Sequence, residues 1–324
     1  MAQLNIVDAI NLGLKQEMKK DKSVIILGED VGIDGGVFRV TDGLYKLYKG
    51  RVFDTPLAES GIIGTSIGLA ASGLKPVAEI QFEGFMFPGI DQLINHAARI
   101  RNRSRGNFHA PMVVRIPIGG GIKALEHHSD SPETYLVHTP GLKVIIPSTP
   151  YDAKGLIISA IRDPDPVIFF EPKRIYRAIK QEVPEKEYTI PIGKAQKLSL
   201  GKDVTVIAYG AMVRECQQAM ALLKDEYISA ELIDLRTLSP LDKTMILQSV
   251  KKTGRAVIVH EAQHTLGVGA EISATINENL LLNLKAPVIR VTGYDIIVPL
   301  AKQEDLYTPN ENRIAEAIKK VVKF

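Results

Sequence analysis

Short runs of β-branched residues alternate with helical patterns along the whole of this 324-residue chain. In the first half, strands are expected at 23–27, 77–82, 112–116, 143–146 and 167–170. The helical patterns between them lie at 5–19, 61–72, 88–101 and 151–162. Strands that alternate with helices favour a parallel sheet with helices on both faces, so the sequence predicts an α/β fold.

The pattern is interrupted once, near the middle of the chain. Residues 181–202 are rich in proline and charge and have little helical period, which is typical of a connector. The alternation then restarts, with strands expected at 203–209, 230–235, 256–259 and 288–291 and helices at 212–225, 243–252, 268–284 and 312–322. We therefore predict a first domain at 1–185, a linker at 186–202 and a second domain at 203–324.

Composition excludes several classes of protein. Lys and Arg number 40 and Asp and Glu 37, a net charge of +3 that is too balanced to favour nucleic-acid binding. No apolar run reaches the roughly 18 residues of a membrane span, and the N-terminus has no signal or transit pattern. The single cysteine, Cys216, has no partner for an internal disulfide or a CxxC site. These features predict a cytoplasmic protein that binds neither membranes nor nucleic acids.

The segment 51–64, Arg-Val-Phe-Asp-Thr-Pro-Leu-Ala-Glu-Ser-Gly-Ile-Ile-Gly, is the most informative for function. It leads from a strand end to Glu59, at the start of a helix of small residues. Each glycine inside a helix costs up to about 1 kcal/mol relative to alanine, so another backbone or a flat ligand is expected to come close. Glu59 is then either an ordinary first-turn charge or a buried catalytic acid.

Two further segments have the residue types of a site. Gly119-Gly-Gly precedes His127-His128 in a loop that follows a strand, where ligand crevices form in parallel sheets. Imidazole titrates near neutral pH, so this pair is a candidate general acid or base, with an ordinary loop position as the alternative. Zinc binding is disfavoured because His-x-x-His spacing and thiolate ligands are missing. Residues 79–85 are either a platform for a flat ring or part of the core.

Some motifs are missing. No GxGxxG follows the first strand, which argues against a nicotinamide dehydrogenase. There is also no Gly-Asp-Gly followed by an Asn-containing segment, the pattern that anchors a magnesium diphosphate. If this chain helps to bind a diphosphate cofactor, another chain must supply that half of the site.

Several motifs occur in the order that one family shows: Gly28-Glu-Asp, Asp54-Thr-Pro-Leu-Ala-Glu-Ser, Glu79-Ile-Gln-Phe, His127-His-Ser and Ile233-Asp-Leu-Arg-Thr-Leu-Ser-Pro-Leu-Asp. Over essentially all of 1–324 the chain resembles the beta subunit of the thiamine-diphosphate-dependent decarboxylase component of 2-oxoacid dehydrogenase complexes. The resemblance implies a thiamine-diphosphate-binding pyrimidine-type domain followed by a transketolase C-terminal-type α/β domain. It also implies an alpha2beta2 heterotetramer, with thiamine diphosphate shared between the subunits and magnesium held by the alpha subunit.

The resemblance assigns roles to single residues. Glu59 would hydrogen-bond N1′ of the aminopyrimidine, and because burial disfavours an ionised carboxylate, a shared proton there would favour the imino tautomer of the ring. His128 would handle protons of the bound intermediate or of the incoming lipoyl group. The residues implied to line the pyrimidine pocket are Glu29, Leu57, Gln81 and Phe85.

Two more features follow from the resemblance. Some family members hold a potassium ion at the helix end that here comprises Ala160, Ile161, Asp163 and Asp165, although Pro164 departs from the usual residue. The second domain, including its final helix, is expected to dock the dihydrolipoyl acyltransferase core of the complex.

The expected reaction is oxidative decarboxylation of a 2-oxoacid and reductive acylation of the lipoyl group of the acyltransferase core. The segments 169–178, 260–262 and 290–295 look more like those of branched-chain 2-oxoacid enzymes, so branched-chain acids are favoured, with pyruvate second. Two alternatives remain open. One is a non-catalytic assembly subunit of the same complex, and the other is a self-sufficient transketolase-like enzyme.

Overall fold

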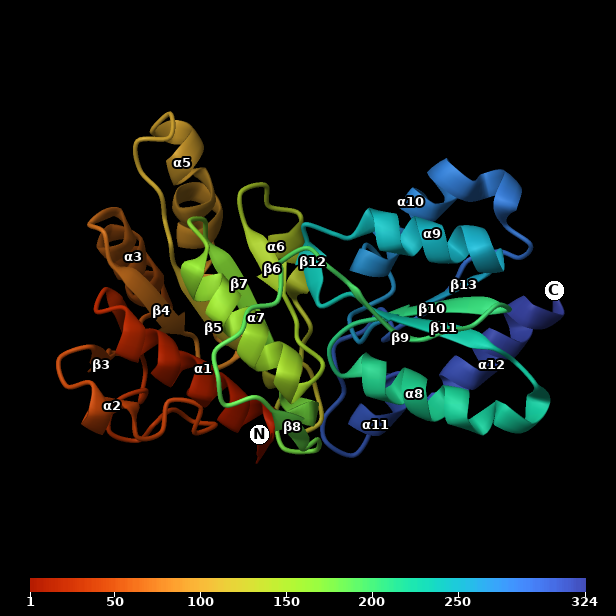
Figure 1. The fold of residues 1–324 in the computed structure, drawn as a ribbon, viewed down its shortest axis with the longest axis horizontal. Coiled ribbons are helices and arrows are strands. Elements are labelled where there is room, and N and C mark those ends of the chain that lie inside the picture. The colour runs from red at the N-terminus through yellow and green to blue at the C-terminus, as the bar shows by residue number, and fades with distance from the viewer. The chain divides into compact units, whose positions relative to one another are not determined.

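A computed structural model describes residues 1–324, which form two compact units (Figure 1). The first comprises residues 1–118 and 135–192, and the second comprises residues 119–134 and 193–324. The second unit thus begins inside the stretch that the sequence suggests as a linker. It also includes the loop 119–134, which lies within the predicted first domain.

Six parallel strands of the first unit lie in the order β6-β7-β5-β4-β2-β3. Their bounds are β2 (Val24–Gly28), β3 (Val52–Asp54), β4 (Lys75–Glu79), β5 (Val113–Ile118), β6 (Lys143–Ile145) and β7 (Val167–Pro172). Every residue of β2, β5 and β7 is buried, because helices cover both faces, and this explains the continuous apolar runs in their sequences. A separate antiparallel pair is formed by β1 (Ala2–Leu4) and β8 (Gln181–Val183).

The helices of the first unit start at identifiable caps. Asn5 caps α1 (Ile6–Lys20), and Thr149 caps α7 (Pro150–Arg162), each by accepting a backbone N–H three residues later. These two helices pack against each other (Figure 1). The remaining helices are α2 (Leu44–Leu47), α3 (Glu59–Ala71), α4 (Met86–Asp91), α5 (Ile100–Arg103) and α6 (Glu133–Val137). The first two residues of α6 are assigned to the second unit and the others to the first.

The second unit is built on a smaller sheet in the order β14-β13-β10-β11-β9, in which only the edge strand β9 is antiparallel. Its strands are β9 (Gln196–Ser199), β10 (Val204–Ala208), β11 (Ala230–Asp234), β13 (Ala256–Val259) and β14 (Ile289–Val291), and a short strand β12 (Thr237–Ser239) follows β11. Its helices are α8 (Met212–Leu222), α9 (Lys243–Thr253), α10 (Val268–Leu280), α11 (Glu304–Tyr307) and α12 (Glu311–Lys323). The pair α8 and α12 and the pair α9 and α10 lie on opposite faces of the sheet (Figure 1).

The predicted α/β fold, with mainly parallel sheets and helices on both faces, is confirmed. The expected single helix at 88–101 is wrong. It is divided into α4, a π-helical turn at Gln92–His96, a 3-10 turn at Ala97–Arg99 and α5. A π turn inserts one extra residue and re-aims the side chains after it, which a reading at 3.6 residues per turn does not detect.

The expected strand at 77–82 ends early, at Glu79, so that Gln81 lies in a bend and Glu83–Phe85 form a 3-10 turn. Strand β9 lies in the stretch predicted as a connector. None of the helices combines the length and the apolar character needed to cross a membrane.

Candidate functional site

Three neighbouring strands of the first unit end at the same edge of the sheet. In the register of β3, β2 and β4, Gly28 lies opposite both Asp54 and Glu79. The residues that follow these strand ends therefore leave the sheet side by side. Ligands bind at this edge in open parallel sheets. The candidate residues that follow these strand ends are Glu29, Leu57, Glu59, Gln81 and Phe85.

Glu59 is the first residue of α3 and is 8% exposed. Its carboxylate makes no hydrogen bond or ion pair with another residue of the chain. The hydroxyl of Thr55, four residues earlier, is buried and also has no hydrogen-bond partner. Buried polar groups are normally paired, so the Thr55 hydroxyl is a candidate for binding a polar ligand, together with the unpaired Glu59 carboxylate near it in the chain.

The other polar candidates lie near Glu59. Burial raises the pKa of Glu29, and the carboxylates of Asp30 and then Glu59 raise it further, so both of these acidic groups are within electrostatic reach of Glu29. The Gln81 side-chain amide donates to Asp30 Oδ2 at 3.3 Å. The structure thus brings Glu29, Glu59 and Gln81 to one edge of the sheet.

Apolar side chains lie at the same strand ends. Phe85 closes the 3-10 turn after β4 and is half-buried, with its ring edge-on to Phe82 at a centroid distance of 6.0 Å. Leu57, in the turn before α3, is 63% exposed. A flat aromatic ring between such groups would meet both apolar surface and polar hydrogen-bonding groups.

The small residues around α3 have two different environments. An added Cβ at Gly89 of α4 would lie 2.5 Å from Ile63 Cδ1 and 3.2 Å from the Glu59 carbonyl oxygen, so α4 approaches the first turn of α3 closely there. By contrast, an added Cβ at Gly68 would meet nothing within 4 Å. At Gly61 and Gly64 an added Cβ would come no closer than 3.7 and 3.5 Å to another atom, so the close approach expected at the glycines of α3 is not found within the chain, and the tight contact belongs to Gly89 of α4.

A buried charge cluster, which the sequence-based predictions do not include, lies on the strands β4, β5 and β7. Arg115 of β5 donates to the carboxylates of Glu79 on β4 and Glu171 on β7, and the Tyr176 hydroxyl donates to Glu171 at 2.6 Å. All four side chains are buried. The available signal was one arginine inside an otherwise apolar strand, Val113–Ile118. A charge in such a strand requires partners of opposite charge.

The two adjacent histidines lie in the loop 119–134 of the second unit. Their rings are tilted against each other, with centroids 4.3 Å apart. The start of this loop is held by carboxylates, since the N–H groups of Gly120 and Gly121 donate to Glu261 and Glu304 at 2.6 and 2.5 Å. The half-buried His127 and His128 are thus on a loop whose backbone is fixed by charge-assisted hydrogen bonds.

At the end of this loop, Glu133 is 1% exposed and accepts a hydrogen bond from the Tyr209 hydroxyl at 2.6 Å. Its second carboxylate oxygen has no hydrogen-bond partner. Burial is the main cause that raises the pKa of Glu133 to about 7, and the nearby Glu261 carboxylate adds to it. The folded protein therefore retains a proton here that the unfolded chain releases at lower pH.

This retained proton predicts a pH effect on stability. Between pH 4.5 and 7 this group binds fewer protons in the unfolded state than in the folded state, so its contribution to wild-type stability falls as pH rises. The shift from 4.5 to about 7 corresponds to about 3 kcal/mol in total. The side chain in Glu133→Gln does not titrate. From pH 4.5 to 7 the free energy of unfolding of this variant should therefore rise by about 3 kcal/mol relative to that of the wild type. Urea-unfolding midpoints at pH 5, 6, 7 and 8 measure the difference.

Glu278→Gln, which changes an exposed carboxylate on α10, is the matched control and should follow the wild-type profile. Parallel pH profiles for wild type and Glu133→Gln would contradict the assignment.

The residues expected at a potassium site lie at the end of α7. The Ala160 carbonyl accepts the Asp163 N–H at 3.2 Å, and the Asp163 carboxylate accepts two bonds from Lys143, at 2.7 and 2.6 Å. Asp165 pairs with Arg101 at 2.7 Å. Ile161 is buried in the same turn. At this helix end the Ala160 carbonyl thus accepts a backbone N–H, and the carboxylates of Asp163 and Asp165 bind cationic side chains.

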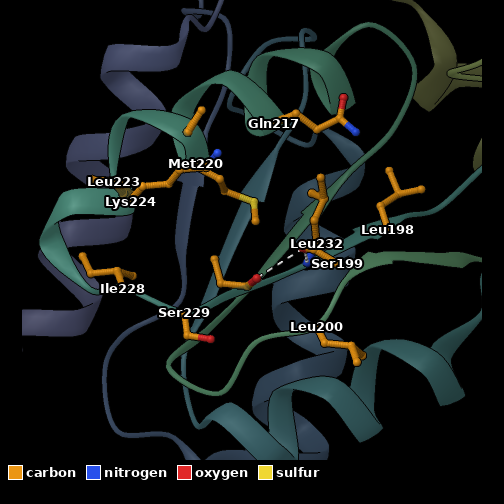
Figure 2. A pocket seen from close by; sticks show the side chains of 12 residues that line it. Leu198, Ser199, Leu200, Gln217, Met220, Leu223, Lys224, Ile228, Ser229 and Leu232 are labelled. Carbon is orange, nitrogen blue, oxygen red and sulfur yellow. Dashed lines mark hydrogen bonds between the residues drawn. The ribbon is translucent and has the colours of Figure 1, made fainter.

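A groove of about 380 Å³ lies in the second unit beside α8 and β9 (Figure 2). Its lining includes Leu198, Met220 and Leu232, and none of the candidate residues borders it. The chain has no cluster of three or more His, Cys, Asp or Glu side chains that could hold a metal ion.

Comparison with known protein families identifies both parts of the chain. Residues 2–179 match the family described as "Transketolase, pyrimidine binding domain". Residues 193–314 match "Transketolase, C-terminal domain". The first match contains the strand edge with Glu59, and the second contains most of the second unit.

Curated relatives match the chain along its whole length. It is 56% identical over 324 residues to "Pyruvate dehydrogenase E1 component subunit beta" of Acholeplasma laidlawii, covering 100% of this chain and 99% of the relative. Proteins of the same name from Bacillus subtilis (strain 168) and Staphylococcus aureus are 50% and 51% identical, and both alignments cover 100% of each chain. A solved structure titled "Split gene transketolase, inactive beta4 tetramer" matches with a TM-score of 0.82 at 20% identity and covers 99% of both chains, which shows a shared fold.

Proposed function

The chain belongs to the beta-subunit family of the 2-oxoacid dehydrogenase E1 component, and from this premise we propose that it acts with an alpha subunit on pyruvate. The reaction is thiamine-diphosphate-dependent oxidative decarboxylation. Carbon dioxide leaves, and the acyl group passes to the lipoyl group of a dihydrolipoyl acyltransferase core as the lipoyl disulfide is reduced.

The choice of pyruvate rests on the relatives. Those with 50–56% identity over the full chain carry the pyruvate dehydrogenase name. The preference for branched-chain acids that the sequence suggests has no support among them. Pyruvate is therefore the first substrate of this proposal, and branched-chain acids are the comparison to be tested.

The observation that carries the proposal is the Glu59 side chain, which is 8% exposed and has no hydrogen bond or ion pair, at the edge where β2, β3 and β4 end. It fits an aminopyrimidine, whose ring nitrogen can share a proton with a carboxyl group. The partnerless Thr55 hydroxyl and the side chains of Phe85 and Leu57 fit the polar and apolar parts of such a ring. Thiamine diphosphate, when bound, supplies the electron sink for decarboxylation.

In this proposal the chain's own residues bind, orient and move protons. Glu59 holds a proton at the pyrimidine N1′ position. Glu29 and Gln81 border the ring, and burial together with the nearby carboxylates of Asp30 and Glu59 raises the pKa of Glu29. His128 would handle protons of the bound intermediate or of the incoming lipoyl group, because an imidazole can accept and donate protons near neutral pH.

The partners follow from the same premise. An alpha subunit would hold magnesium and the diphosphate of the cofactor, in an alpha2beta2 tetramer. The acyltransferase core would bind the assembled enzyme through the second unit.

A substrate panel tests the proposal. The chain is co-expressed with an alpha subunit and assayed with pyruvate, 3-methyl-2-oxobutanoate and 4-methyl-2-oxopentanoate, with and without thiamine diphosphate. We expect cofactor-dependent decarboxylation, with kcat/KM at least about tenfold higher for pyruvate, a difference of about 1.4 kcal/mol in transition-state binding. Higher kcat/KM for a branched-chain acid would contradict the substrate choice. Inactivity towards all three acids in an assembled tetramer would favour the non-catalytic assembly role.

A further inference from the structure

A fully buried ion pair lies beside the turn that carries Phe85. The Lys173 ammonium donates to both carboxylate oxygens of Glu83, at 2.7 and 2.6 Å, and both side chains are 0% exposed. Glu83 is the first residue of the turn Glu83–Phe85, and Lys173 directly follows β7. The pair therefore connects the turn after β4 to the end of β7.

These two segments are not neighbours in the sheet, because β5 lies between β4 and β7. The segment after β4 is also held by β5, since the Ile80 N–H donates to the Arg115 carbonyl at 3.0 Å. The Lys173–Glu83 pair adds a second attachment, which joins the turn Glu83–Phe85 to the end of β7. Lys173 also lies over the Phe82 ring, with Nζ 5.6 Å from its centroid, and Phe82 contacts Phe85 edge-on.

Stability alone is a weak reason for this pair. Taking two charges out of water is expensive, and replacing both members of a buried pair by apolar side chains of similar volume is often neutral or stabilising. Removing only one member is strongly destabilising, because it leaves a buried charge without its counter-ion. A buried pair that adds little net stability can still fix the position of the segment that it holds.

We propose that Lys173 and Glu83 are positioning residues for the pyrimidine pocket. They hold residues 81–85 so that Gln81 and Phe85 face the aminopyrimidine ring. The inference rests on the proposed function, and it assigns to the ion pair the placement of the pocket's β4 side. Neither residue of the pair needs to contact the cofactor.

The test uses the tetramer assembled with the alpha subunit. The double variant Lys173→Met with Glu83→Leu replaces the pair by apolar side chains of similar volume. We expect its melting temperature without cofactor to stay close to that of the wild type. Its dissociation constant for thiamine diphosphate with magnesium, measured by calorimetry, should rise at least about tenfold, because the pocket is no longer preorganised. The KM for the cofactor should rise in parallel, with a smaller change in kcat.

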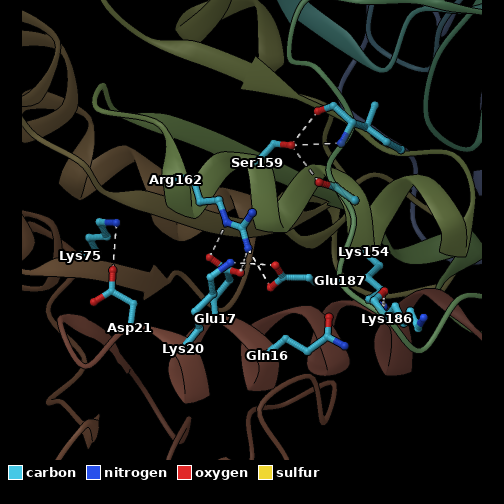
Figure 3. Close-up of polar contacts among 12 residues, drawn as sticks. Gln16, Glu17, Lys20, Asp21, Lys75, Lys154, Ser159, Arg162, Lys186 and Glu187 are labelled. Atoms are coloured by element: carbon cyan, nitrogen blue, oxygen red, sulfur yellow. Dashed lines mark hydrogen bonds and ion pairs between the residues drawn. The ribbon is translucent and has the colours of Figure 1, made fainter.

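A second ion pair in the same unit provides the matched control. Arg162 on α7 donates to the Glu17 carboxylate on α1 at 2.9 and 2.5 Å and to Glu187 at 3.1 Å (Figure 3). This pair joins two helices and includes no residue of the turn 81–85. The double variant Glu17→Leu with Arg162→Met should bind the cofactor as the wild type does. Equal weakening in both double variants would indicate general loosening of the unit and would overturn the inference.

Other outcomes are decisive as well. A stable Lys173→Met, Glu83→Leu variant with wild-type cofactor affinity overturns the inference, even though the wild type is active. If that variant does not assemble, Lys173→Arg tests the inference instead, because arginine retains the positive charge but changes the shape of the side chain. Weakened cofactor binding in an assembled Lys173→Arg tetramer supports positioning, and unchanged binding contradicts it. Absence of cofactor-dependent turnover in the wild type would instead count against the proposed function.

Discussion

Replacing Glu59 by glutamine should lower kcat by at least about 100-fold in the tetramer, within the range that general acid–base groups contribute. Glutamine preserves the size of the side chain but cannot hold an exchangeable carboxyl proton at the pyrimidine nitrogen. The side chain is 8% exposed and makes no hydrogen bond within the chain, so little of the fold depends on its charge. Assembly with the alpha subunit and the melting temperature should remain close to wild type.

The helix position itself requires a control. Glu59 is a first-turn carboxylate of α3, and such charges stabilise a helix N-terminus by typically about 0.3–1 kcal/mol. Asp8→Asn removes an exposed first-turn carboxylate from α1 and should leave kcat unchanged. Steady-state kinetics with saturating cofactor separates the two effects. Full activity in Glu59→Gln would show that this carboxylate does not act in catalysis.

The sequence predicts those parts of the fold that local patterns determine. Buried parallel strands are uninterrupted apolar runs, and β13 was predicted with its observed bounds, Ala256–Val259. Helix α9, predicted at 243–252, has its ends fixed by neighbouring residues, since Asp242 caps its start and Gly254 takes the left-handed conformation at its end. The alternation of such elements was sufficient to predict an α/β fold.

Features set by tertiary packing could not be predicted in this way. The helix expected at 88–101 is broken next to a tight contact, since an added Cβ at Gly141 would lie 2.1 Å from the Ala98 carbonyl oxygen. The partners of Arg115 are 36 and 56 residues away in the chain. Neither contact leaves a periodic pattern in the local sequence.

The candidate site also combines features that the local sequence predicts with features that depend on tertiary contacts. The position of Glu59 at the start of a helix was evident from the sequence, because small residues follow a Thr-Pro turn. The bond between Gln81 and Asp30 joins residues 51 apart, and the contacts of Gly120 and Gly121 span 141 and 183 residues. Only the three-dimensional structure reveals that these groups hold the loops on which the candidate residues lie.

Thiamine diphosphate should bind to this chain at least about 100-fold more weakly than to its tetramer with the alpha subunit, a difference of about 2.8 kcal/mol. The pyrimidine edge carries the carboxylates of Glu29, Asp30 and Glu59, which are close enough to raise the pKa of Glu29. Such a group of acids repels a diphosphate. We therefore expect the anionic half of the cofactor to need a cation and binding groups from another subunit.

The most direct measurement of this claim is calorimetric titration of thiamine diphosphate, with magnesium, into the chain alone, the alpha subunit alone and their assembled complex. We predict strong binding only in the complex, and weaker binding when the complex contains Glu59→Gln. Binding to the isolated chain with the affinity of the complex would contradict a shared site and would favour the self-sufficient transketolase-like enzyme.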